Sequence, residues 1–344
     1  MGGDLDVRAV ENLPKVWDTF VRNHLEATVF HTREWLEAVE ATFGYEPRHR
    51  LLHDTTGEVV GVLPGFVVPD PPAYSVLNPF CEYGFPLLAD RVDGAAVLST
   101  VADGVGRLGA LVIKDVDWSG VRGYSTAGYG GTSTGTVHRL DADRPLEEVR
   151  ESAFAKQARQ RTRAAEDHGV DVVEGDVETF YPLYVDTMER LGSPQFPSTF
   201  FEALDARLGE ALTVLVAEAE GRPIGAMFLL KWGDVSMIWG NGSKASSWEL
   251  RPNHLLYTRA IERACRDDSS VVDFGRSRQD SGVHEFKSQF GGTTRSLTSF
   301  VTPPHRSTRA SLEGYERLAP VTSRLAPLIT HPSVGPALKR LIHE

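Results

Sequence analysis

The sequence contains only two cysteines and no long hydrophobic run. Cys81 and Cys265 stand far apart, so they match neither a disulfide framework nor a paired metal site. No segment approaches the roughly 20 apolar residues that a membrane-spanning helix needs. The N-terminal MGGDLDVRAV lacks the basic region and the apolar core of a signal peptide. These absences predict a cytoplasmic protein without a transmembrane segment.

Lysine is also scarce. Seven of the 36 basic residues are lysines, and the formal net charge is -11. An acidic surface keeps a protein soluble in a salt-rich cytoplasm, and GC-rich codon usage explains the arginine bias equally well. The acidity disfavours a general nucleic-acid coat protein but is compatible with a local basic groove.

Several catalytic and cofactor motifs are missing as well. The histidines form no His-Glu-x-x-His zinc motif, and no Gly-x-Ser-x-Gly elbow is present. The glycine-rich GYGGTSTG at 128–135 precedes an expected strand instead of a helix, so we do not expect it to bind phosphate. We therefore expect no metal and no resident cofactor.

What is present is a pattern that occurs twice. The 344 residues suffice for about two domains, and each half shows helices, a hairpin, a further helix and a further strand. The hairpins contain VVGVLPGFVV in the first half and RPIGAMFLL in the second. Duplicated α/β units predict a tandem repeat of one fold. We place the first domain at 1–143, the second at 144–302 and a C-terminal helical extension at 303–344.

The second half gives the clearer expectations. PLEEVRESAFAKQARQRTRAAEDHG (145–169) is predicted to form one helix, because proline stands at its start and glycine at its end. PNHLLYTRAIERACRDD (252–268) is predicted to form another, with Pro252 in the first turn. VVDF (271–274) reads as a buried strand, and the polar residues 275–285 as a loop after it. A mostly antiparallel sheet that receives a helix and then a parallel strand is the order of the GNAT acyltransferase fold.

Two stretches carry a family resemblance, the Pro-Asn-x-Leu-Leu helix start and the block DFGRSRQDSGVHEFKSQFGG. They resemble the FemAB-like aminoacyltransferases and the BioF2 (CelD)-like acyltransferases. The resemblance implies two GNAT-like domains that join an activated acyl donor to an amine of a small-molecule or lipid-linked envelope precursor. Two alternatives stay open. One is a CoA-dependent N-acyltransferase acting on a sugar amine or lipid precursor, and the other is a non-catalytic binding protein of the same fold.

Lys287 is the catalytic candidate, because it stands at the lysine of the family's Phe-Lys-x-x-Phe-Gly block. A fixed ammonium stabilises the oxyanion formed during acyl transfer. The alternative is a surface lysine whose stem packs along Phe286 and Phe290. Asp273 and Arg276 flank the end of the strand, where binding groups are common. Arg276 either binds a phosphate or carboxylate or forms an ion pair with Asp273. No general base is predicted.

Further residues are candidates for substrate binding: Glu82 and Tyr83 in NPFCEYGFPLL, Trp239 in a strand, Asn253 and Tyr257 at a helix start, and Arg159 and Arg163, which share a helix face with Lys156. Each has a structural alternative. Asn253 is expected to cap its helix, Tyr257 to pack in the core, Glu82 and Tyr83 to pack between domains, and the basic face to be solvated.

The donor stays open between aminoacyl-tRNA and acyl-CoA. Acetyl-CoA enzymes of this fold usually carry a glycine-rich loop after the fourth strand, whose N–H groups hold the pyrophosphate. Here that region reads SKASSWELRPNHLLY, which argues against ordinary CoA binding. The family's long helical arm is absent, which weakens the case for a tRNA donor. The C-terminal PALKRLIHE is short, and peripheral contact with a membrane is one expectation for it.

Overall fold

The computed structural model describes residues 5–70, 73–105, 109–116, 122–305, 329–332 and 334–342. It divides into two compact units. The first comprises Met1–Gly135, Arg295–Arg317 and Arg340–Glu344, and the second Thr136–Thr294 and Leu318–Lys339. Both units are therefore discontinuous in sequence. The contiguous domains expected at 1–143 and 144–302 remain a prediction about the repeat and do not coincide with these units.

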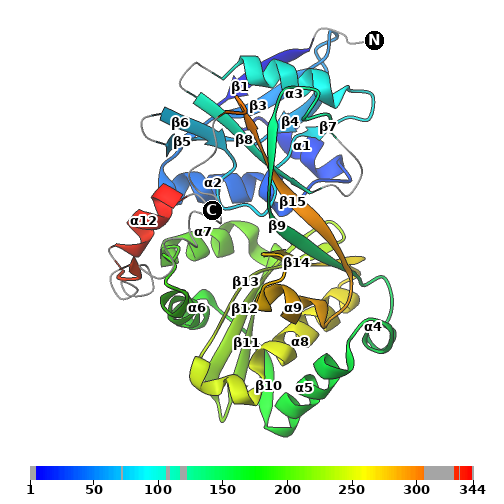
Figure 1. Ribbon diagram of the computed structural model, residues 1–344, viewed down its shortest axis with the longest axis vertical. Helices are drawn as coiled ribbons and strands as arrows, with labels where there is room; N and C mark the ends of the chain where they lie inside the picture. The colour runs from blue at the N-terminus through cyan, green and yellow to red at the C-terminus, as the bar shows by residue number, and fades with distance from the viewer. Residues whose placement is uncertain are drawn as a thin grey trace. The chain divides into compact units, whose positions relative to one another are not determined.

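The first unit contains a four-stranded sheet, a further group of paired strands and three helices among its described residues (Figure 1). One sheet has the strand order β1-β3-β4-β7, and the strands β8, β6, β5 and β2 lie side by side with β15 next to β8. The bounds are β1 (Asp6–Val10), α1 (Lys15–Asn23), α2 (Arg33–Phe43), β2 (Glu46–Pro47), β3 (His49–His53), β4 (Val59–Leu63), β5 (Phe66–Asp70), β6 (Ala73–Leu77), β7 (Leu87–Leu88), α3 (Gly94–Asp103) and β8 (Gly109–Val116).

The second unit is built on a sheet with the order β10-β11-β12-β13-β14-β9. β9 begins in the first unit, and its residues from Thr136 onward belong to the second. The bounds are β9 (Gly130–Asp141), α4 (Leu146–Ser152), α5 (Lys156–Asp167), β10 (Val170–Gly175), α6 (Val177–Leu191), α7 (Ser198–Leu208), β11 (Leu212–Ala219), β12 (Arg222–Trp232), β13 (Val235–Ser243), α8 (Pro252–Arg266), β14 (Val271–Ser277), α9 (Gly282–Ser288) and α12 (Gly335–Ile342). β15 (Thr293–Thr302) follows α9, and its residues from Arg295 onward belong to the first unit.

The two units repeat one arrangement of strands and helix. In the first, β6 and β8 are parallel neighbours joined through α3. In the second, β13 and β14 are parallel neighbours joined through α8. The duplication expected from the sequence is thus present as two mixed α/β units.

The helix expected over 145–169 is two helices, and the interruption has a physical cause. Phe154 is 3% exposed and turns into the core, where its ring lies edge-on to Phe290 at 5.2 Å. Ala155 then donates its N–H to the carbonyl of Gln289 instead of continuing the helical ladder. A tertiary hydrogen bond and one buried aromatic ring therefore override a sequence of strong helix formers.

The segment expected as a loop over 275–285 is also different. β14 continues to Ser277, and α9 begins at Gly282. Ser281 caps α9, since its hydroxyl accepts a hydrogen bond from the N–H of His284. The cap residue was visible in the sequence and would have indicated this short helix.

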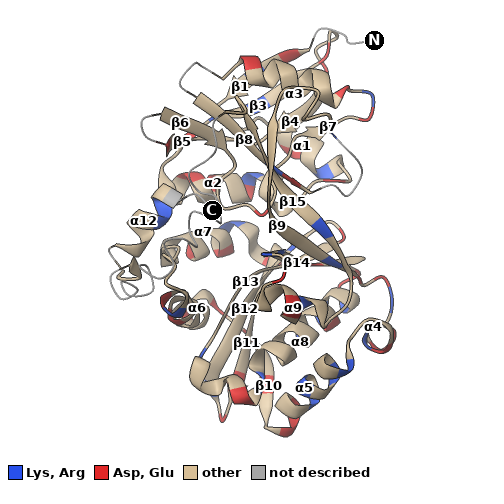
Figure 2. Ribbon diagram, in the orientation of Figure 1, with Lys and Arg blue, Asp and Glu red and all other residues tan. Residues whose placement is uncertain are grey.

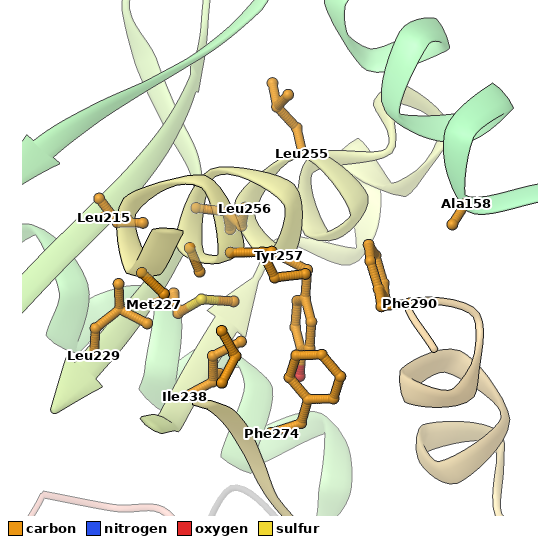
Figure 3. Packing of buried hydrophobic residues seen from close by; sticks show 14 of the residues in the cluster. Ala158, Leu215, Met227, Leu229, Ile238, Leu255, Leu256, Tyr257, Phe274 and Phe290 are labelled. Carbon is orange, nitrogen blue, oxygen red and sulfur yellow. The ribbon is translucent and has the colours of Figure 1, made fainter. Parts of the chain in front are cut away.

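The core of the second unit lies where α5, α8 and α9 cover one face of the sheet (Figure 1). Figure 3 shows Tyr257, Phe274 and Phe290 gathered beside Leu256 and Ile238. On α8 the first turn begins with Pro252, as expected. Of the C-terminal extension, residues 306–328 lie outside the described part of the chain, and α12 is its described helix.

Candidate functional site

β13 and β14 part from each other in the middle of the second unit. They pair only at Val235–Val271, Ser236–Val272 and Met237–Asp273. Beyond these pairs β13 stays bonded to β12, and β14 stays bonded to β9. The facing edges of the two strands therefore carry backbone N–H and C=O groups that no ladder between them uses. Such edges can bond the amides of an extended ligand.

Lys287 lies at this divergence and is buried, with 5% exposure. Its ammonium donates hydrogen bonds to two successive carbonyls of β14, those of Gly275 at 3.2 Å and Arg276 at 2.7 Å. A bulge in β14 makes this geometry available, because the register shifts here and Gly275 has φ +66°. The alternative of an exposed lysine is excluded: α9 holds the ammonium inside the unit.

The side chain of Asp273 stabilises the same bulge. It is 0% exposed, its Oδ1 accepts the N–H of Gly275 at 2.8 Å, and its Oδ2 accepts Nε of Arg139 at 2.8 Å. The ion-pair partner that the structure shows is thus an arginine of β9, 134 residues away in sequence. Arg276, half-buried, contributes its backbone carbonyl to Lys287. Asp273 therefore has a structural task whether or not it meets a ligand.

Two histidines that were not predicted, His138 and His284, lie in this region. His138 of β9 is 3% exposed, and its Nε2–H donates to the carbonyl of Gly291 at 2.6 Å. Nδ1 then carries the lone pair, and no described residue bonds to it. Burial lowers the pKa of His138, and the charges of His284 and Lys287 act in the same direction. The neutral form of the imidazole is therefore favoured, and its unbonded Nδ1 is buried. Nothing in TVHRLD distinguishes it from an ordinary strand residue.

Asn253 and Tyr257 begin α8 but do different things. Asn253 does not cap the helix as expected: its Nδ2 donates to the hydroxyl of Ser243 at 3.2 Å, and Arg251 is the N-cap residue. Tyr257 is 3% exposed and packs on Phe286 and Phe290, so core packing is the role that the structure shows. Burial also raises the pKa of its hydroxyl.

Only some of the basic residues of α5 are available to bind an anion. Figure 2 shows Lys and Arg in blue along this helix. Lys156 and Arg163 are exposed, whereas Arg159 donates from Nη1 to the carbonyls of Arg150 and Phe154. Arg159 thus closes the junction between α4 and α5. Binding of an anion by this face remains a prediction that rests on Arg163 and Lys156.

Trp239 lies among aromatic rings of α7 and of the segment that precedes it. Its ring stacks on Phe196 at 5.6 Å and meets Phe200 edge-on at 6.0 Å. The ammonium of Lys339 lies over the ring of Phe196, 4.4 Å from its centroid. This half-buried position is compatible with binding, but packing is what the structure shows.

In the first unit, the segment 78–86 fills the corresponding divergence of β6 and β8. The N–H of Gly84 donates to the carbonyl of Lys114 on β8 at 3.0 Å. That carbonyl lies three residues beyond the last parallel pair, Val76–Leu111, as the Arg276 carbonyl does beyond Met237–Asp273. In the first unit a backbone N–H therefore bonds the carbonyl whose counterpart in the second unit is bonded by the Lys287 side chain.

The predicted residues Glu82 and Tyr83 belong to this filling segment. Tyr83 is 1% exposed, lies edge-on to Phe30 at 5.7 Å and stacks on Phe85. Glu82 is half-buried beside it. The packing of Tyr83 is internal to the first unit and does not support its role in lining a cleft.

A cavity of about 960 Å³ also lies in the first unit, and none of the predicted site residues lines it. Two of its carboxylates already have partners, since Glu58 pairs with Arg91 and Glu26 with Arg122. Within the described ranges, no cluster of three or more His, Cys, Asp or Glu side chains is arranged to hold a metal ion. No helix in the part of the chain that is described is long and apolar enough to cross a membrane.

Known proteins share this arrangement. Residues 152–288 match the family described as acetyltransferase (GNAT) domain, and no curated protein sequence gives a significant match. Among solved structures, FemX is similar with a TM-score of 0.66 and 15% identity, over 86% of this chain and 96% of that one.

Two further structures are similar over nearly the whole chain. A tandem GNAT protein from the clavulanic acid biosynthesis pathway has a TM-score of 0.55 and 12% identity, over 87% of this chain and 98% of that one. L-PGS from Bacillus licheniformis has a TM-score of 0.52 and 14% identity, over 87% of this chain and 96% of that one. The predicted fold class and the predicted acyltransferase are confirmed: the chain has a FemAB-like tandem GNAT fold, and its residues 152–288 match the model of the acetyltransferase (GNAT) domain.

Proposed function

We propose that this protein forms an amide bond by transferring an aminoacyl or acyl group to an amine of a cell-envelope precursor. The observation that carries the proposal is the buried ammonium of Lys287 at the divergence of β13 and β14, inside the segment that matches the GNAT domain. The similarity to FemX and L-PGS supports an envelope substrate, small or lipid-linked.

The proposed reaction follows ordinary acyl transfer. The amine attacks the carbonyl carbon of the donor, and an oxyanion forms. When it collapses, the bond to the leaving oxygen or sulfur breaks, and the proton lost by the amine ends on that leaving group. An ammonium held in a water-poor site stabilises the oxyanion more strongly than it would in water. Its two hydrogen bonds to β14 keep Lys287 in one position before the donor arrives.

The donor is proposed as aminoacyl-tRNA, with acyl-CoA as the second candidate. The description of the matched family and the parting strand edges favour the second, because the two amides of a pantetheine arm can bond such edges. The missing glycine-rich loop before α8 favours the first. Both donors occur in the cytoplasm, where we place the reaction. Mass spectrometry of products formed with charged tRNA or with acyl-CoA separates the two.

Lys287→Met tests the proposal. We expect transfer to fall by about 10²–10³-fold, because the oxyanion loses its donor. Two carbonyls of β14 also lose their partner, so the free energy of unfolding should fall by about 1–3 kcal/mol. Rates are therefore measured well below the unfolding midpoint, by following amide formation in single-turnover experiments.

Thr162→Ala is the matched control. Thr162 is 0% exposed, and its hydroxyl bonds that of Thr258 at 2.9 Å, so its loss should cost about 1–2 kcal/mol without touching Lys287. Transfer should persist in this variant. If Lys287→Met retains near wild-type turnover, or if both variants lose activity in proportion to their stability, Lys287 is not catalytic.

A further inference from the structure

Arg50 is a buried arginine in the middle of β3 in the first unit. It is 6% exposed, and its backbone lies between Leu63 of β4 and Ala9 of β1. Its Nη1 is fully buried and has no hydrogen-bond partner among the described residues. None of the ion pairs found in the described ranges includes Arg50.

Two other shielded arginines of this chain meet a carboxylate. Arg122, with its side chain 13% exposed, pairs with Asp115 and Glu26. Arg139, at 20%, pairs with Asp273. Arg50 is more deeply buried than either and lacks such a partner in the described structure.

The charge of Arg50 is not removed by its surroundings. Burial lowers the pKa of the guanidinium, but a guanidinium remains protonated at neutral pH. The groups whose charges act on it are Tyr129, Tyr74 and Arg48, and Arg48 adds a second positive charge. The hydroxyl of Tyr129 donates to the carbonyl of Leu98, so its proton is already used. The charge of Arg50 is therefore not compensated by a described carboxylate.

An isolated buried cation is costly, even after local relaxation, unless an anion meets it. We propose that Arg50 is the anchor of a binding site for an oxyanion, a phosphate or carboxylate group carried by a ligand. The planar fork of the guanidinium binds either group through two parallel hydrogen bonds. The site lies in the first unit and does not depend on the transfer reaction proposed for the second.

The test compares thermal unfolding in sodium phosphate, sodium acetate and sodium chloride at equal ionic strength, with the full chain and with Arg50→Met. At a hundredfold excess of phosphate or acetate over its Kd, the midpoint of the wild type should rise by about 5 °C relative to chloride. Whichever anion acts identifies the group. Arg50→Met should show no such difference beyond the general salting effect, which it measures. In chloride, Arg50→Met should unfold at or above the wild-type temperature, since replacing an unpaired buried charge by a hydrophobic side chain is neutral or stabilising.

Arg48→Met is the matched control. Arg48 lies two residues before Arg50, but its side chain is exposed and paired with Glu46. It should keep the anion effect. The proposal is overturned if Arg50→Met keeps the same anion-dependent rise, if the wild type shows no rise with either anion, or if Arg50→Met in chloride is markedly less stable than the wild type.

Should Arg50→Met not fold, Arg50→Lys takes its place in equilibrium dialysis with radiolabelled phosphate and acetate. Lysine keeps the charge but not the fork. Binding of one anion per wild-type chain, weakened at least about tenfold in Arg50→Lys, supports the site. Equal binding by the two proteins, or no binding by the wild type, refutes it.

Discussion

At the scale of residues, the chemistry around Lys287 was partly predictable. The Phe-Lys-x-x-Phe-Gly block pointed to the lysine, but its neighbours Phe286 and Phe290 were also compatible with a surface lysine, which the structure excludes. The partners of the ammonium could not be predicted, because they are backbone carbonyls presented by a bulge. His138 and Arg139 were missed for a related reason: they reach this place only through the pairing of β9 with β14.

The pairing of Asp273 with Arg139 leads to a prediction about stability. Asp273→Ala should lower the free energy of unfolding by about 3 kcal/mol, because Arg139 loses its counter-ion and the N–H of Gly275 loses its acceptor. Urea unfolding monitored by circular dichroism measures the loss. The double variant Asp273→Ala, Arg139→Met should be no less stable than the single variant. Additive losses would show that the pair is not coupled.

At the scale of elements, the regular segments followed the sequence, and their interruptions did not. α2 ends at Gly44, which adopts the left-handed conformation that favours glycine. The break between α4 and α5 and the presence of α9 depended on tertiary contacts of Phe154 and on a cap at Ser281. Local helix propensity does not predict the break at Phe154, because the break depends on a contact with a residue distant in sequence.

The packing of α6 on β13 is close enough to test with one methyl group. A Cβ added at Gly242 would overlap the carbonyl of Leu183 and approach the N of Tyr184 to 2.7 Å. Backbone cannot move aside cheaply, so Gly242→Ala should destabilise the fold by about 1–3 kcal/mol. Gly240→Ala on the same strand is the control, since its nearest atom, Cζ of Phe180, is 3.7 Å away. Chemical denaturation of both variants decides this: equal midpoints would mean that the helix is not held at this distance.

At the scale of the whole molecule, the duplicated pattern predicted the tandem α/β fold. The limits of the compact units were beyond such a pattern, because β15 follows the second unit in sequence but pairs with β8 of the first. A strand's partner depends on which edge is available, and a single strand's sequence does not specify that edge.

Buried histidines make the folded molecule sensitive to acid. Burial lowers the pKa of His31 and His254 from 6.5 to about 4 and that of His49 to about 3. Between pH 6.5 and about 4 the unfolded chain binds protons at these sites while the folded chain does not, so the free energy of unfolding should fall as the pH decreases. Asp115 opposes this below pH 6, because burial raises its pKa to about 6 and its folded form binds the proton first.

Urea unfolding at pH 7, 6 and 5 measures this slope. His49→Asn should flatten it by up to about 1.4 kcal/mol per pH unit, since the variant has one proton-binding site fewer. The amide oxygen can still accept the N–H of Gly65, which Nδ1 of His49 accepts now. An unchanged slope would mean that His49 is not neutral in the folded state.

The filled divergence in the first unit has a consequence for how the two halves can change. Phe80, Cys81 and Tyr83 there are interior residues whose substitution alters packing, whereas Lys287 occupies the matching place with a single side chain. Removing that segment to open a second site would also cut the connection from β6 to β7. The duplicated architecture is therefore asymmetric in its tolerance: one half can acquire a new ligand by changing side chains, and the other only by rerouting its backbone.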